Sequence, residues 1–155
     1  MTKADKLYNQ AVTNMEALYR KINSNIPDYD LFEIPIINTW AEYPKVSVAN
    51  GAVSQKGLKS KGKHYRVVKL KYEDYAKLYP HTHYGYWEYI FVLKGVFKDI
   101  NGYSYKPGDS ILVDGYDPHL LECLTTKGEL MIIFAKEKKY ASIKYIREYL
   151  KKEGV

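Results

Sequence analysis

The sequence has 155 residues, of which 46% are hydrophobic, and this is enough for one domain with a sizeable core. No apolar run approaches the roughly 20 residues that a membrane-spanning helix needs, and the first residues lack the apolar stretch of a secretory signal, so we expect a cytoplasmic protein. The formal net charge is +6, but the lysine-rich stretches 56–71 and 136–152 are interspersed with tyrosine and apolar residues, which favours a solvated basic face over a nucleic-acid interface. The single cysteine, Cys123, excludes an intramolecular disulfide framework and lies in an apolar stretch that predicts a buried structural thiol.

The first predicted element is an amphipathic helix over residues 3–23. Its apolar side chains recur at steps of three and four residues, which is the period of one helical stripe, and they are Leu7, Ala11, Met15, Leu18 and Ile22. Small polar residues and Pro27 then end the helix. We expect residues 1–26 to form a helical extension that docks on the rest of the domain or on a partner chain.

Short strands and loops are expected over residues 27–63, because their apolar pieces are separated by proline, glycine and lysine. From residue 65 to residue 135 the pattern sharpens into strand-sized pieces, bounded by turn signals such as Lys94-Gly95 and Asn101-Gly102. Closely spaced strands with such turns predict an antiparallel sandwich or barrel. Residues 140–152 return to helical spacing, so we expect a C-terminal helix that closes one end or face of this barrel.

Three of the four histidines lie in the strand-rich part of the chain beside Glu88. His81 and His83 are two residues apart, and in a strand such residues point to the same face, roughly 6.5 to 7 Å apart, so two imidazoles can converge on one ion. The four residues that follow allow a turn that brings the Glu88 carboxylate back beside them. His119 follows a proline-containing loop and can supply a fourth ligand from another part of the wall. His64, in the lysine-rich stretch, is expected on the surface.

This pattern resembles the cupin superfamily. The sequence His81-Thr82-His83, four residues, Glu88, six residues and Gly95 matches the first cupin motif at every fixed interior position. The second motif is matched more loosely by Gly108-Asp109, Pro118 and His119, with the proline directly before the histidine and no asparagine after it. The resemblance covers Tyr79 to about Ala135. It implies one all-β cupin domain over residues 1–155, a double-stranded β-helix or jelly-roll barrel, with the N-terminal and C-terminal helices attached.

A site of three histidines and one carboxylate suits one divalent first-row transition metal, Fe, Mn, Ni, Co or Zn, better than calcium or magnesium. Four protein ligands on an octahedral ion leave two positions for water or substrate. By strand alternation Ile90 and Val92 share the inward face of Glu88, and Leu121 and Cys123 share that of His119. The aromatic residues between the ligands, Tyr86 among them, form a rim or pack against a neighbouring sheet. Arg66, Lys69 or Lys71 is a candidate to hold an anionic substrate.

Two classes of function remain open, because the cupin fold does not choose between them. The first is a metal-dependent dioxygenase, isomerase or lyase that acts on a small oxygen-rich metabolite in the barrel, with Glu88 and Tyr86 as candidate catalytic residues. The second is a non-catalytic module that senses a ligand or a metal through a partner or a second copy. In either case we expect a small-molecule ligand and a homodimer, since cupin sheets present open edges and apolar outer faces.

Overall fold

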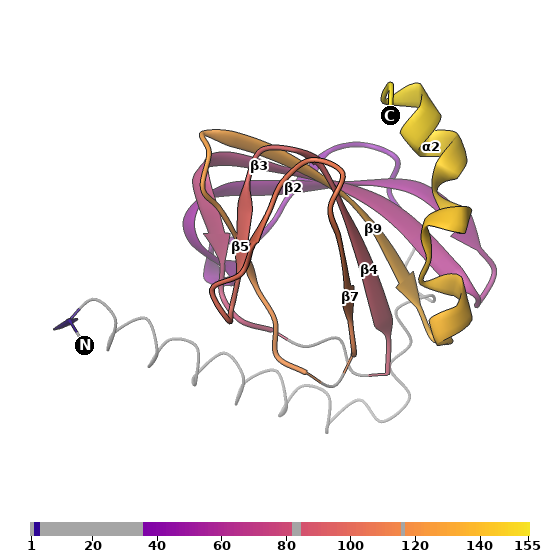
Figure 1. Cartoon of the computed structure of the whole chain (residues 1–155), viewed down its shortest axis with the longest axis horizontal. Coiled ribbons are helices and arrows are strands. Elements are labelled where there is room, and N and C mark those ends of the chain that lie inside the picture. The colour runs from indigo at the N-terminus through magenta and orange to yellow at the C-terminus, as the bar shows by residue number, and fades with distance from the viewer. Residues whose placement is uncertain (1, 4–35, 82–84, 116) are drawn as a thin grey trace.

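The computed structural model describes residues 2–3, 36–81, 85–115 and 117–155, and there the chain forms one antiparallel sheet that curls into a nearly closed barrel (Figure 1). Its strands are β1 (Ala41–Glu42), β2 (Val48–Lys61), β3 (Tyr65–Leu78), β4 (Trp87–Lys94), β5 (Phe97–Asp99), β6 (Ser104–Tyr105), β7 (Ser110–Val113), β8 (Leu121–Cys123) and β9 (Lys127–Ala135). They follow the order β6-β5-β8-β3-β9-β4-β7, and β2 pairs with both β3 and β1. The predicted antiparallel barrel is confirmed.

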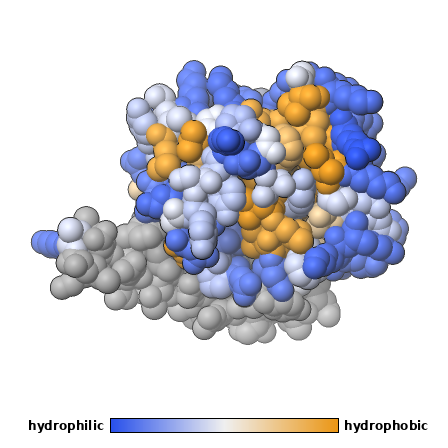
Figure 2. All heavy atoms as spheres, viewed as in Figure 1, coloured by the Kyte–Doolittle hydropathy of each residue, from blue (hydrophilic) through white to orange (hydrophobic). Residues whose placement is uncertain are grey.

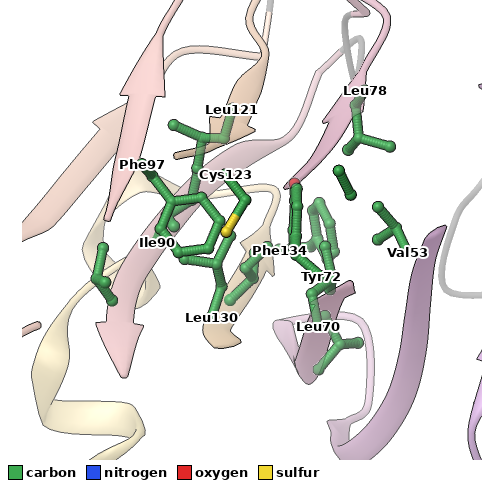
Figure 3. Packing of buried hydrophobic residues seen from close by; sticks show 14 residues of the cluster. Val53, Leu70, Tyr72, Leu78, Ile90, Phe97, Leu121, Cys123, Leu130 and Phe134 are labelled. Atoms are coloured by element: carbon green, nitrogen blue, oxygen red, sulfur yellow. The ribbon is translucent and has the colours of Figure 1, made fainter. Parts of the chain in front are cut away.

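One apolar cluster fills the interior of the barrel (Figure 3). Alternate residues of β3, β4 and β9 contribute to it, because successive side chains of a strand point to opposite faces. Its members include Val68, Leu70, Tyr72, Ile90, Val92, Leu121, Cys123, Leu130, Ile132 and Phe134. The predicted inward face of Ile90 and Val92, and that of Leu121 and Cys123, is therefore confirmed. Cys123 is buried, as expected, and its thiol donates to the carbonyl of Thr125 at 3.3 Å.

A second apolar cluster covers the outer face of β3, β9 and β4. The outward side chains of these strands, including Val67, Phe91 and Ile133, pack there against the C-terminal segment, which contributes Ile146 and Leu150. Figure 1 shows this segment lying along one side of the barrel and ending in α2 (Arg147–Lys152). Part of the apolar outer face is thus covered by the chain itself.

The C-terminal segment is less helical than predicted. In place of one helix over residues 140–152, the structure has two single-turn 3₁₀ helices, Lys138–Tyr140 and Ile143–Tyr145, followed by the six-residue α2. The backbone leaves the helical region at Ala141 (φ −86°, ψ 66°) and Ser142 (φ −147°, ψ 159°). Ala141, Ile146 and Leu150 of this segment are buried against the sheet, so tertiary packing and not the helical spacing alone sets its path.

The strands before the histidines are longer than predicted, because β2 and β3 each span 14 residues and pair along most of their length. The register shifts of β2 occur between Val48 and Ala52 and between Gly57 and Lys59, which explains why this strand shows no regular alternation. The predicted N-terminal helix falls on residues outside the described ranges. No helix in the described part of the chain is long and apolar enough to cross a membrane.

Candidate metal centre

Three of the four predicted ligands, His81, Glu88 and His119, come from different parts of the barrel wall and meet at one place. His81 lies just beyond the end of β3, and His119 lies just before β8. The two form an isolated antiparallel bridge: the His81 amide donates to the His119 carbonyl at 3.0 Å, and the His119 amide donates to the His81 carbonyl at 2.9 Å. Their imidazole centroids are 4.4 Å apart. Glu88 enters from β4, on the inward face that it shares with Ile90.

Glu88 and His119 are in direct contact, with Oε2 of the carboxylate 2.7 Å from Nε2 of the imidazole. Both side chains are buried, at 5% and 12% exposure. Burial by itself lowers the pKa of His119, but the attraction of the Glu88 carboxylate and the hydrogen bonds to Glu88 and to the Asp117 backbone together raise it above its usual value. The His119 imidazole therefore holds its proton more tightly beside Glu88, and a metal ion that binds to this nitrogen must displace the proton.

The backbone orients both imidazole rings. Nδ1 of His81 lies 2.8 Å from the carbonyl oxygen of Tyr79, and Nδ1 of His119 lies 3.4 Å from that of Asp117. A carbonyl oxygen only accepts, so each Nδ1 is assigned as the protonated nitrogen, and in the neutral tautomer Nε2 keeps its lone pair. Histidines that bind metals are commonly held in this way, with one ring nitrogen on a backbone carbonyl and the other on the ion.

One pair of donor atoms, Glu88 Oε2 and His119 Nε2, has a separation close to that of two neighbouring ligands on a first-row metal ion. Two ligand atoms about 2.1 Å from an ion and at right angles to each other lie about 3.0 Å apart, close to the 2.7 Å between Glu88 and His119. Imidazole nitrogen with carboxylate oxygen is also the donor set that such ions take. Among the described residues, no group of three or more His, Cys, Asp or Glu side chains has a metal-binding arrangement. His83, the fourth predicted ligand, lies outside those residues.

Tyr86, the predicted catalytic tyrosine, is buried at 6% exposure and lines neither of the two cavities described below. Its neighbour Trp87 packs on the outer face of the barrel, where the Lys138 ammonium lies 5.2 Å from the centre of its ring. Trp87 was expected either in an aromatic rim or packed against the sheet, and it is packed on the sheet. The catalytic assignment of Tyr86 stays a prediction.

A small cavity of about 20 Å³ lies inside the barrel directly behind the ligands. His81, Glu88 and His119 form its polar end, and most of its remaining wall is apolar, including Leu70, Ile132 and Phe134. Its volume is enough for about one water molecule. A water molecule or a single polar group in this cavity would therefore contact both the predicted metal ligands and the apolar side chains of the barrel interior.

Two tyrosines outside the predicted site, Tyr43 and Tyr72, also line this cavity. The hydroxyl of Tyr43 donates to Oε1 of Gln55 at 2.6 Å. Burial and the nearby Glu88 carboxylate raise the pKa of Tyr43 above its usual range, so its phenol stays neutral. No local motif marks Tyr43, because it precedes β2 and reaches the cavity only when the barrel forms.

A second cavity, of about 240 Å³, adjoins the first. It lies where the edge strand β7 faces the β5–β6 turn and the segment before β8, at the seam of the barrel. Its wall is largely apolar, with Asp99, Asp114 and Asp117 added, and Ile90, His119 and Leu121 belong to both cavities. Figure 2 shows apolar surface gathered where Figure 1 places β7. The seam therefore offers a small molecule a place beside His119.

The candidate anion-binding residues before the first motif do not line either cavity. Lys69 pairs on the outside of the barrel with Glu153 at 2.6 Å, and the Lys71 ammonium lies 4.2 Å from the centre of the Trp40 ring. Arg66 is buried at 7% exposure and is paired in register with Phe134, which in turn pairs with Glu88. Arg66 is therefore the one of the three that lies in the same row of the sheet as a predicted ligand.

No protein-family model matches the sequence, and no curated protein matches it. Solved structures do match the fold. KdgF from Halomonas sp. is 18% identical, with a TM-score of 0.56 over 66% of this chain and 92% of that one. A predicted oxalate decarboxylase from Thermotoga maritima is 22% identical, with a TM-score of 0.55 over 66% of this chain and 98% of that one. For a transcriptional regulator from Vibrio cholerae the identity is 20% and the TM-score 0.49, and this chain covers 50% of its length.

At these identities the similarity concerns the fold alone. An RmlC-like cupin from Shewanella frigidimarina is 21% identical, with a TM-score of 0.52 over 65% of this chain and 87% of that one. Together with the barrel, its similarity and those of KdgF and the oxalate decarboxylase show that this chain is a cupin-fold protein.

Proposed function

We propose that this protein is a divalent-metal-dependent enzyme that acts on a small oxygen-rich metabolite, with His81, His83, Glu88 and His119 as the metal ligands. The observation that carries the proposal is the buried contact of 2.7 Å between Glu88 and His119, with the His81 ring beside it. A carboxylate and imidazoles converge there at a cavity, although burying them costs free energy in the absence of an ion or a proton. A bound metal ion would offset this cost, because it would neutralise the carboxylate and accept the imidazole lone pairs.

The two cavities support a small molecule as the substrate. The larger one has room for its body beside His119, and the smaller one lies behind the ligands. A bound ion would supply Lewis-acid or oxygen chemistry at this place. The protein itself would have two tasks. The apolar wall of the larger cavity would exclude water from the substrate, and the Glu88 and His119 side chains would hold the ion at the inner cavity.

The first test is elemental analysis of the protein purified without a histidine-rich tag and without added metal. We expect near one equivalent of a first-row metal, and its loss in His81→Ala and His119→Ala. The matched control is His64→Ala, because His64 is exposed outside the site and its ring lies 5.0 Å from that of Tyr140. A folded parent protein that takes up no iron, manganese, cobalt, nickel or zinc would refute the metal centre.

The same preparations distinguish the enzyme from the alternative, a non-catalytic sensing module. An enzyme should lose turnover in Glu88→Gln while remaining folded. A sensing module should bind metal or ligand equally well, show no turnover with any chelating metabolite, and change its association with a partner or a second copy when the ligand binds. Metal uptake without turnover and with ligand-dependent association would therefore favour the module.

A further inference from the structure

The polar groups of the inner cavity restrict what it can hold. Most of its wall is apolar, and its polar side chains are the three ligands at one end together with Tyr43 and Tyr72. A volume of about 20 Å³ admits one oxygen atom, either as water or as a single hydroxyl group, but not the body of a metabolite. The larger cavity, which shares His119 with the inner one, takes that body under the proposed function.

The direction of the Tyr43 hydrogen bond defines the polarity of the part of the wall that Tyr43 forms. The phenol donates its hydrogen to Gln55 Oε1 at 2.6 Å, so the oxygen of Tyr43 has only lone pairs left for another partner. Tyr43 is also held in place by its backbone, whose amide donates to the Val53 carbonyl at 2.8 Å. An oxygen atom that bears a hydrogen suits this wall better than a bare carbonyl oxygen.

We propose that Tyr43, oriented by Gln55, is a positioning residue that accepts a hydrogen bond from the hydroxyl group of the substrate in the inner cavity. The substrate class is then a small chelating molecule whose donor oxygen carries a hydrogen, such as a 2-hydroxy acid. A carbonyl or ether oxygen in the same place would face the lone pairs of Tyr43 and lose affinity. This inference rests on the proposed function, since it concerns a ligand of the same metal centre.

Two matched probes test the inference without knowledge of the natural substrate. Glycolate and methoxyacetate carry the same carboxylate and an oxygen in the same place, but only glycolate has the O–H group. Their binding to the cobalt-loaded full chain is followed by visible absorption, for the parent protein, Tyr43→Phe, Gln55→Met and Tyr75→Phe. Tyr75 is the control, because it is 53% exposed and lines neither cavity.

We expect the parent protein and Tyr75→Phe to bind glycolate several-fold more tightly than methoxyacetate. Tyr43→Phe should weaken glycolate roughly 3- to 10-fold, the usual effect of losing one hydrogen bond, and leave methoxyacetate within about twofold. Gln55→Met should have a smaller effect in the same direction. This loss of preference is a result that a merely structural role of Tyr43 would not give.

Three outcomes would overturn the inference. One is an equal affinity of the parent protein for both probes, the second is an equal change for both in Tyr43→Phe, and the third is loss of cobalt uptake in that variant, which would make its role structural. Cobalt uptake by the parent protein, read from the same spectra before any probe is added, reports on the proposed function separately. A parent protein that binds no cobalt refutes both, whereas one that binds cobalt without preference refutes only the role of Tyr43.

Discussion

Glu88 and His119 are joined across the interior of the barrel by a contact of 2.7 Å between Oε2 and Nε2, although one lies on β4 and the other just before β8. Removing one member of a buried pair leaves the other in a poorly solvated place, whereas removing both avoids that cost. We expect Glu88→Leu and His119→Leu each to lower the free energy of unfolding of the metal-free protein by about 3 kcal/mol.

The double variant Glu88→Leu/His119→Leu should then lose much less than the sum of the two single variants. Urea unfolding, with the parent protein and all three variants in one thermodynamic cycle, measures the coupling between the two residues. Strictly additive losses would show that the contact contributes nothing to stability.

Metal binding should raise the thermal stability of the parent protein, because an ion that binds only the folded state stabilises it by mass action. At a free metal concentration about 100 times the dissociation constant, the gain is about 2.7 kcal/mol. For a domain of this size we expect the melting temperature to rise by about 5 to 10 °C. Differential scanning calorimetry with and without a chelator measures the shift, and His119→Ala should abolish it. The same rise in His119→Ala would locate the ion elsewhere.

Stability should fall in alkaline solution because of the buried tyrosines. Burial is the main cause that raises the pKa of Tyr72 well above its usual value, and electrostatic interactions with Tyr43 and Glu88 add to it. The folded protein therefore holds this proton more tightly than the unfolded chain. Its contribution to stability is complete below pH about 10, where tyrosine titrates in the unfolded chain, and is lost as the pH rises from there towards the folded-state pKa.

Tyr72→Phe should remove part of this dependence. Urea midpoints measured between pH 8 and pH 11 should fall less steeply above pH 10 in Tyr72→Phe than in the parent protein. The exposed Tyr75 gives the control variant Tyr75→Phe, which should retain the slope of the parent protein. Identical slopes in all three proteins would rule out Tyr72 as the source.

Gly95, the last fixed residue of the first motif, should resist substitution for two separable reasons. Its φ is +83°, and a Cβ atom built on it would lie 2.6 Å from Oγ1 of Thr125 and 2.7 Å from the carbonyl oxygen of Lys127. Gly102 has a similar φ of +89°, but a Cβ atom there meets nothing within 4 Å. We expect Gly102→Ala to cost about 1 kcal/mol, from backbone strain, and Gly95→Ala clearly more. Equal midpoints in urea would show that the close contacts relax freely.

The expected homodimer remains a prediction, and exposed apolar side chains on the described surface support it. They include Ile100 and Leu112, which are 45% and 44% exposed beside the seam. Size-exclusion chromatography with light scattering should give twice the mass of the chain at micromolar concentration. Leu112→Lys should shift the protein towards the monomer if β7 takes part, and a monomeric parent protein would end the expectation.

Several features of the protein could be predicted from the sequence because they depend on local rules. Strand alternation placed Ile90 and Val92 inside the barrel, the turn residues separated the strands after residue 65, and the apolar surroundings of Cys123 indicated its burial. The sequence pattern likewise predicted a common site for His81, Glu88 and His119; these side chains lie near one another, and their role as metal ligands stays a prediction. Each inference needed only the period of a strand and the geometry of a turn.

Other features were decided by tertiary structure. Pairing with β3 makes β2 one long strand despite its bulges, and the outer face of the sheet draws the C-terminal segment out of a regular helix. Tyr43 reaches the inner cavity, and β7 comes to face the β5–β6 turn, only when distant segments pack together. A sequence pattern records the period of an element but not which distant element it will meet, because that depends on the closure of the whole barrel.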